Sequence, residues 1–196
     1  YLERTFRINV KNSSLEFSIR RFLSMKRDEI GVIRYSIRSV DFNGSISFTP
    51  FIDGNVVNRD SNYDEKFWDM QETRSGKGYA QLKARTRKSG FVSCMSMRYS
   101  LILDEKEIGP EPEVTERSDF VSNRVNTDLQ PGQELTLYKY VSVLTSLNHE
   151  PDLMLEEGTK HATNACNTGF ESLFEEHAAI WEEKWAHSDI IIEGDT

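Results

Sequence analysis

Residues 2–10 read Leu-Glu-Arg-Thr-Phe-Arg-Ile-Asn-Val, and their apolar side chains fall at even positions, namely Leu2, Phe6, Ile8 and Val10. Successive side chains of a β-strand point to opposite faces of the sheet. The period of two therefore predicts a strand with one face in a core and the other in water. The same alternation returns twice downstream, at Leu15, Phe17 and Ile19 and at Ile33, Tyr35 and Ile37.

Turn signals and further apolar runs extend this pattern along the chain. Asn43-Gly44 is typical of a β-hairpin, and Pro131-Gly132 of a turn between strands. No helical period interrupts the strand-like runs at 79–86, 91–99, 120–125 and 135–145. Short strands at regular spacing predict a mainly β fold, an antiparallel super-β-sandwich over residues 1–150.

The pattern changes at Pro151. Asp152 is placed to cap a helix that runs toward Cys166, although Gly158 weakens such a helix. Thr168-Gly169-Phe170-Glu171 fits a capping box at the start of a second helix. We therefore predict an amphipathic helical linker over residues 151–196.

The second helix carries an apolar stripe. Its members recur at three and four residues and include Phe170, Phe174, His177, Trp181 and Trp185. A stripe of this size needs cover, because burial of one aromatic side chain removes about 150–250 Å² from water at about 25 cal/mol per Å². We expect the linker to pack on the sandwich, to self-associate or to be poorly ordered in the absence of a neighbour.

Composition and charge limit the class of protein. Hydrophobic residues make up 37% and charged residues 29%, which is typical of a globular domain. Residues 1–100 carry a net charge of +7 and residues 101–196 a net charge of −15, which predicts that the halves neutralise each other. Nucleic-acid binding is disfavoured by the acidic total, and no apolar run is long enough for a membrane helix. Cys94 and Cys166 are expected to be free thiols in the cytoplasm.

Few residues indicate chemistry of their own. His177 lies between aromatics and lacks a partner that would orient a catalytic base, so a hydrogen-bonded packing histidine is favoured. Ser75-Gly76-Lys77-Gly78 lacks the first glycine and the terminal Ser or Thr of a phosphate loop, which favours a hairpin turn. No Cys and His spacing fits a metal site, so neither a metal nor a cofactor is expected.

The segment 51–69 is a long connection rich in Asn and Asp. Connections of this length are often binding or interface loops. Its candidate residues for a domain interface or for sugar contact are Asp53, Asn55, Asn58, Phe67 and Trp68. A surface loop fixed by Phe67 and Trp68 is an equally weighted alternative.

Several parts of the chain resemble a known family. The runs Arg21–Met25, Ile33–Ile37 and Ile52–Asn58 are similar to the N-terminal domain of glycoside hydrolase family 65, and Asn58–Trp68 resembles its maltose phosphorylase branch. Residues Gly169–Asp195 resemble the linker that leads into the catalytic barrel of that family.

The resemblance implies a galactose-mutarotase-like sandwich that scaffolds an (α/α)6 catalytic barrel and takes part in a homodimer. The parent enzyme would cleave an α-glucosidic disaccharide with inorganic phosphate as co-substrate, inverting the anomeric centre to give β-glucose 1-phosphate and glucose. The catalytic glutamate and phosphate pocket would lie in the barrel, so the chain alone is expected to be inactive. A stand-alone carbohydrate-binding module is the alternative.

Overall fold

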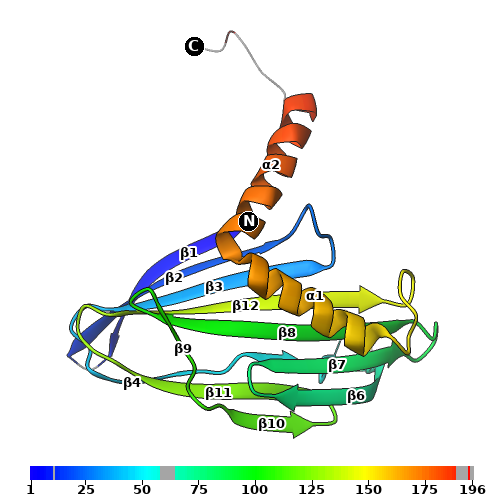
Figure 1. Cartoon of the computed structure of the whole chain (residues 1–196), viewed down its shortest axis with the longest axis horizontal. Helices are drawn as coiled ribbons and strands as arrows, with labels where there is room; N and C mark the ends of the chain where they lie inside the picture. Colours follow the sequence, from blue (N-terminus) through cyan, green and yellow to red (C-terminus); the bar gives the residue numbers. More distant parts are fainter. Residues whose placement is uncertain (11, 58–64, 189–193, 195–196) are drawn as a thin grey trace.

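The computed structural model describes residues 1–10, 12–57, 65–188 and 194 of the chain. These residues form strands followed by two helices, coloured from blue to red along the chain in Figure 1. The strands are β1 (Leu2–Val10), β2 (Ser13–Leu23), β3 (Ile30–Ser39), β4 (Gly44–Phe48), β5 (Phe51–Asp53), β6 (Trp68–Gly76), β7 (Tyr79–Thr86), β8 (Val92–Leu103), β9 (Lys106–Ile108), β10 (Glu113–Arg117), β11 (Phe120–Leu129) and β12 (Glu134–Thr145). The helices are α1 (Met154–Thr168) and α2 (Phe170–Ser188).

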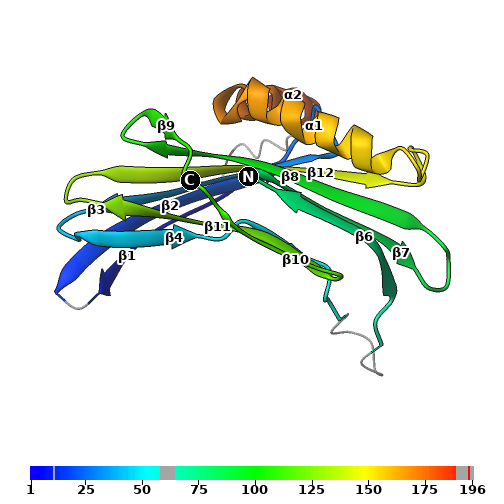
Figure 2. The same ribbon diagram turned by 60° about the horizontal axis from the view of Figure 1, so that its bottom comes forward.

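The strands form two antiparallel sheets. The large sheet has the order β1-β2-β3-β12-β8-β7-β6, with β9 paired to β8, and the small sheet has the order β10-β11-β4, with β5 paired to β11. Figure 2 shows the small sheet beneath the large one and α1 above it. The predicted antiparallel sandwich with C-terminal helices is confirmed.

Strand β12 shows how alternation builds the two layers of the core. Leu135 and Leu137 pack between the sheets with Phe48, Val125 and Leu129. On the opposite face of β12, Tyr140 packs under the helices with Phe170 and Leu173. A central strand buried on both faces therefore joins the interior of the sandwich to the seat of the helices.

Two interpretations of the strands need correction. Gly44 begins β4, which pairs with β11 rather than with β3, so Asn43-Gly44 carries the chain from the large sheet to the small sheet instead of closing a hairpin. All nine residues of β1 are exposed, although one face was predicted to lie in a core. The reason is its place at the edge of the large sheet, where its only strand neighbour among the described residues is β2.

Helix α1 lies against the outer face of the large sheet. Gln81 of β7 donates from Nε2 to the Leu155 carbonyl (2.6 Å), and Arg98 of β8 donates from Nε to Thr163 Oγ1 (3.2 Å). Gly158 permits this close approach, because a Cβ built on it would lie 2.4 Å from Ser96 Oγ. Gly158, which was predicted to weaken the helix, is thus the residue that allows α1 to pack closely on the sheet.

The predicted helix caps are wrong. Leu153 occupies the N-cap of α1 without a side-chain cap, so Asp152 does not serve there. Thr168 is the last residue of α1, where its Oγ1 donates to the Asn164 carbonyl (2.9 Å), and it does not cap α2. Gly169 separates the helices with φ 83° and ψ 161°, a region that residues with a Cβ essentially avoid.

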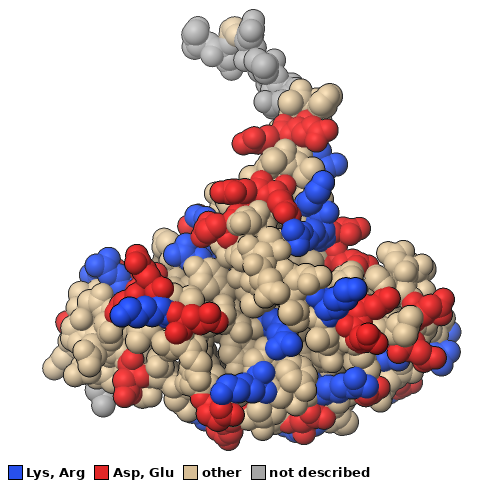
Figure 3. All heavy atoms as spheres, in the orientation of Figure 1, with Lys and Arg blue, Asp and Glu red and all other residues tan. Residues whose placement is uncertain are grey.

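The uneven charge of the two halves is partly neutralised within the molecule. Arg27 pairs with Glu176 (2.8 Å), Arg34 with Glu134 (3.9 Å) and Lys77 with Glu111 (2.5 Å), and each pair joins the basic half to the acidic half. Figure 3 shows basic and acidic side chains interspersed over the visible face of the sandwich. This arrangement supports mutual neutralisation of the two halves.

Candidate functional site

The candidate site is the aromatic face of α2 together with the groove beside it. Phe170 and His177, in the first half of the helix, are 3% and 4% exposed, whereas Trp181 and Trp185 are 38% and 57% exposed. In Figure 1 the second half of α2 points away from the sheets. The predicted stripe is real, but the sandwich covers only its first half.

Phe22 of β2 fixes the covered half of the stripe. Its ring lies 5.5 Å from the rings of Phe170 and Phe174 and 4.9 Å from the imidazole of His177, measured between centroids. Edge-on aromatic pairs at these distances stabilise a packing arrangement beyond the burial of their area. The first two turns of α2 are therefore held on the large sheet by a cluster of rings.

Arg27 adds a polar anchor from the connection between β2 and β3. Its Nε and Nη2 donate to the two carboxylate oxygens of Glu176 (3.0 and 2.8 Å), and its Nη1 donates to Thr168 Oγ1 (3.1 Å). A two-pronged guanidinium–carboxylate pair fixes orientation as well as distance. One side chain thus holds the end of α1 and the start of α2.

His177 is buried as predicted, but the predicted hydrogen bond is not found. Neither of its ring nitrogens has a partner within the described part of the chain. The backbone of Leu23 is near enough to favour the protonated ring but does not reach hydrogen-bond geometry. Burial lowers the pKa of His177, so a neutral ring is favoured. An orphaned polar side chain at this depth is unusual in a folded domain.

A groove of about 930 Å³ opens beside His177 and Trp181. It runs from α2 along the hairpin end of β2 and β3, and most of its wall is apolar. Further lining residues are Tyr1, Leu2, Arg21, Phe22, Leu23, Met25, Asp28, Glu29, Ile30, Gly31, Val32, Ile33, Val141 and Val143. Trp181 therefore lines the groove, and Trp185 stacks on Trp181.

The structure places four of the five loop candidates at the ends of segment 51–69. Asp53 Oδ1 accepts a hydrogen bond from the backbone N–H of Asn55 (2.9 Å), and Asn55 Oδ1 accepts one from Lys66 Nζ. Trp68 begins β6 and packs, half-buried, against the core under β7, and Phe67 precedes it. Asn58 lies outside the described residues. The two ends of the segment are thus brought together.

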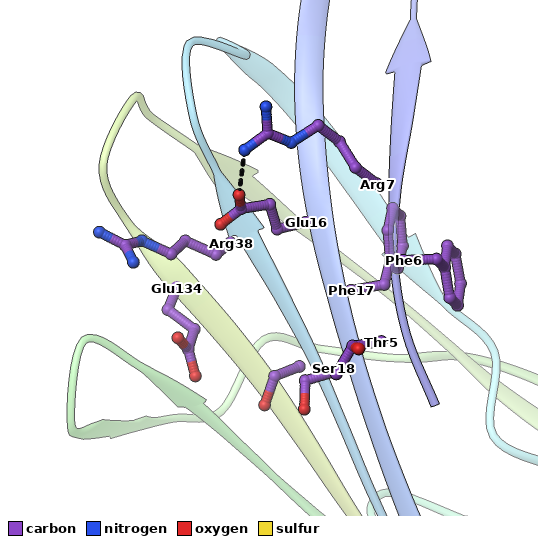
Figure 4. A pocket seen from close by; sticks show the side chains of 9 residues that line it. Thr5, Phe6, Arg7, Glu16, Phe17, Ser18, Arg38 and Glu134 are labelled. Atoms are coloured by element: carbon purple, nitrogen blue, oxygen red, sulfur yellow. Dashed lines mark hydrogen bonds and ion pairs between the residues drawn. The ribbon is translucent and has the colours of Figure 1, made fainter. Parts of the chain in front are cut away.

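A second hollow, of about 440 Å³, lies over β1, β2 and β3. Figure 4 shows Arg7 directed at Glu16 within it, with Arg38 and Glu134 nearby. Arg7 and Glu16 pair with each other, which leaves less charge to receive a ligand. The remaining lining residues are Thr5, Phe6, Phe17, Ser18 and Ser36. The hollow is therefore a face of the sheet on which charged side chains pair with each other, and not a site where they converge on a ligand.

Other sites considered from the sequence have structural explanations. Lys77-Gly78 is the turn between β6 and β7, as predicted, and Gly78 has φ 79°. Cys94 and Cys166 are free thiols. Among residues 1–10, 12–57, 65–188 and 194, no group of His, Cys, Asp and Glu is arranged to hold a metal.

Sequence reasoning missed two polar clusters that connect distant parts of the chain. Arg27 and Glu176 are 149 residues apart, and His149 meets Glu29 across 120 residues. Lys139 was also missed; it donates to the Phe51 carbonyl (2.6 Å), and burial lowers its pKa to about 8. No local motif marks such contacts, because each joins two segments that lie far apart in the chain.

No helix among the residues that the structure describes is long and apolar enough to cross a membrane.

The domain family described as "Glycosyl hydrolase family 65, N-terminal domain" matches residues 1–184. The maltose phosphorylase of Bacillus subtilis (strain 168) is 26% identical over 194 residues, which are 99% of this chain and 25% of that protein. The alpha,alpha-trehalose phosphorylase of Thermoanaerobacter brockii is 28% identical over 190 residues, covering 92% of this chain and 24% of that protein.

A solved structure, a putative kojibiose phosphorylase from human microbiome, superposes with a TM-score of 0.85 at 18% identity and covers 98% of this chain and 24% of that one. The chain thus spans about a quarter of the length of these relatives. The family match covers the sandwich, α1 and α2 as far as Lys184. The chain therefore belongs to the family of N-terminal domains of glycosyl hydrolase family 65.

Proposed function

We propose that this chain is the non-catalytic N-terminal domain of a disaccharide phosphorylase of the maltose phosphorylase kind, and that it scaffolds the (α/α)6 catalytic barrel. The proposal rests on the apolar stripe of α2, of which the sandwich covers only the first half. Trp181 and Trp185 stack on each other with ring centroids 6.4 Å apart, yet both remain exposed beyond the sandwich. Exposed apolar surface of this kind marks an interaction site.

The chemistry proposed for the whole enzyme is inverting phosphorolysis of an α-glucosidic disaccharide to β-glucose 1-phosphate and glucose. Inversion needs a general acid at the leaving oxygen and phosphate at the opposite face of the sugar. Inorganic phosphate is the co-substrate, and no other cofactor is proposed. Two of the described carboxylates, Glu29 and Glu176, are engaged by His149 and Arg27. We propose that the acid and the phosphate pocket lie in the barrel, and that the enzyme is cytoplasmic, where free thiols such as Cys94 and Cys166 persist.

Strand β1 supports a homodimer. It is an edge strand of the large sheet, and Leu2, Phe6, Ile8 and Val10 are each about 40% exposed on it. An exposed apolar edge strand is a ready surface for association. Replacement of Ile8 by Glu is expected to shift the complete enzyme from dimer to monomer in light scattering, and an unchanged mass would remove β1 from the interface.

A carbohydrate-binding module that works alone is the second candidate, because Asp53, Asn55, Phe67 and Trp68 could contact a sugar. The scaffold is favoured because the Asp53 and Asn55 side chains already have local partners and Trp68 is half-buried. Calorimetry of this chain with maltose separates the two. The scaffold predicts no binding at millimolar sugar, and saturable binding would favour the module.

The test of the scaffold compares residues 1–196 with the complete enzyme that the proposal implies. We expect phosphate-dependent cleavage of maltose by the complete enzyme and none by residues 1–196. Trp181→Ser with Trp185→Ser should weaken that activity or destabilise the barrel, whereas Leu147→Ser should not. Leu147 is a matched control, since it is 78% exposed and lies in the loop after β12, away from α2. Activity of residues 1–196 alone would overturn the proposal.

A further inference from the structure

His149 lies between two carboxylates that come from different parts of the fold. Its Nε2 is 2.7 Å from Glu29 Oε1 and its Nδ1 is 2.7 Å from Glu157 Oε2. Glu29 belongs to the connection between β2 and β3, His149 to the loop after β12, and Glu157 to the first turn of α1. A single ring therefore joins three segments.

The geometry decides the protonation state of this ring. An ionised carboxylate has only acceptor oxygens, whereas a neutral imidazole has one donor nitrogen and one acceptor nitrogen. A neutral ring would face one carboxylate with a lone pair, which is repulsive. Both contacts are satisfied together only when both ring nitrogens carry protons. The arrangement thus requires an imidazolium when Glu29 and Glu157 are ionised.

We propose that His149 is a pH-sensitive clamp, which as a cation ties the first turn of α1 to the connection between β2 and β3 and which releases that turn when it loses its proton. His161 of α1 also faces the cluster, with Nδ1 3.4 Å from Glu29 Oε2, so Glu29 serves two imidazoles. The same connection holds the junction of the helices through Arg27. Release at Glu29 therefore loosens one of two anchors that this connection provides.

The sign of the effect follows from the contacts. The hydrogen bond with Glu29, assisted by that with Glu157, raises the pKa of His149 above its ordinary value of 6.5. A group whose folded pKa is raised stabilises the fold fully below its unfolded value and loses that contribution as pH rises through the folded value. The clamp is therefore fully closed at pH 6.5, and it opens as the pH rises through the raised pKa of His149.

The experiment measures the ring by NMR titration and α1 by amide hydrogen exchange, using protection factors corrected for intrinsic rates. The His149 signal, identified by its loss in His149→Gln, should titrate above 6.5. Protection of the first turns of α1 should fall as the pH rises above 6.5 and through the raised pKa of His149, by about tenfold for each unit by which the pKa is raised. Amides of β8 serve as the internal reference.

Two variants keep the test decisive. In Glu157→Gln a neutral ring can donate to Glu29 and accept from the new amide, so the fall in protection should shrink to less than half of its size. His187→Gln is the matched control, because His187 lies on the exposed end of α2 and bonds only to the Glu183 carbonyl among the described residues; it should behave as the natural chain does. A ring that titrates at or below 6.5, or equal pH profiles in the natural chain and Glu157→Gln, would overturn the clamp.

Discussion

Helices α1 and α2 follow the sandwich one after the other in the chain, yet they contact it through different side chains. After Met154 and Leu155 in its first turn, helix α1 buries only small residues, Gly158, Ala162 and Ala165, and lies close to the large sheet. Helix α2 presents large rings, of which Phe170 is buried and Trp185 is exposed. Small residues allow a helix to pack closely on the sheet of its own domain. Large exposed rings at the end of a helix instead indicate a surface that packs against another domain or protein.

The largest expected effect comes from removing the ring that seats α2. Phe170→Ala should lower the free energy of unfolding by about 3–5 kcal/mol, because Phe170 is 3% exposed and packs against Phe22, Tyr138 and Phe174. Urea denaturation followed by circular dichroism measures this loss. A change below about 1 kcal/mol would show that α2 is not seated by its rings.

Gly158→Val should act on α1 with the next largest effect. A side chain there meets Ser96 Oγ at 2.4 Å and Ser96 Cβ at 3.3 Å, so the helix has to lift from β8 at an expected loss of about 2–3 kcal/mol. The same denaturation experiment measures it.

The control for this substitution is Gly158→Ala with Ser96→Ala, which removes the closest contact and gains helix propensity. That pair should recover most of the loss. If Gly158→Val proved harmless, close approach would not be what distinguishes α1 from α2.

Gly169→Ala tests the junction between the helices. No atom outside its neighbours lies within 4 Å of the position of a new Cβ, so the expected loss of about 1–3 kcal/mol comes from backbone strain alone. Hydrogen exchange should show faster opening in α2 than in α1. Equal opening of both helices would mean that they unfold as one unit.

Trp185→Ser should have the smallest effect on this chain. Because Trp185 is 57% exposed, the free energy of unfolding of residues 1–196 should change by less than about 0.5 kcal/mol. Thermal unfolding measures it. A loss comparable with that of Phe170→Ala would show that the second half of α2 is already covered, and the contrast between the two helices would disappear.

The strands could be predicted because a period of two survives in any sandwich. The partner of a strand could not, since Ile46 alternates in the same way whether β4 pairs with β3 or with β11. Gly158 was read as a weakness because helix propensity is local and says nothing of Ser96, 62 residues earlier in the chain. The stripe of α2 was visible in the sequence, but the point at which the sheet ceases to cover it depends on Phe22.

The exposed part of α2 gives leverage to the residues that hold its first half. The helix has 19 residues, and at about 1.5 Å per residue it is about 28 Å long. A rotation of about 10° about its first turn would move its far end by about 5 Å. The direction of the helix, and with it the position of whatever Trp181 and Trp185 touch, is thus set by Phe22 and Arg27 at its base.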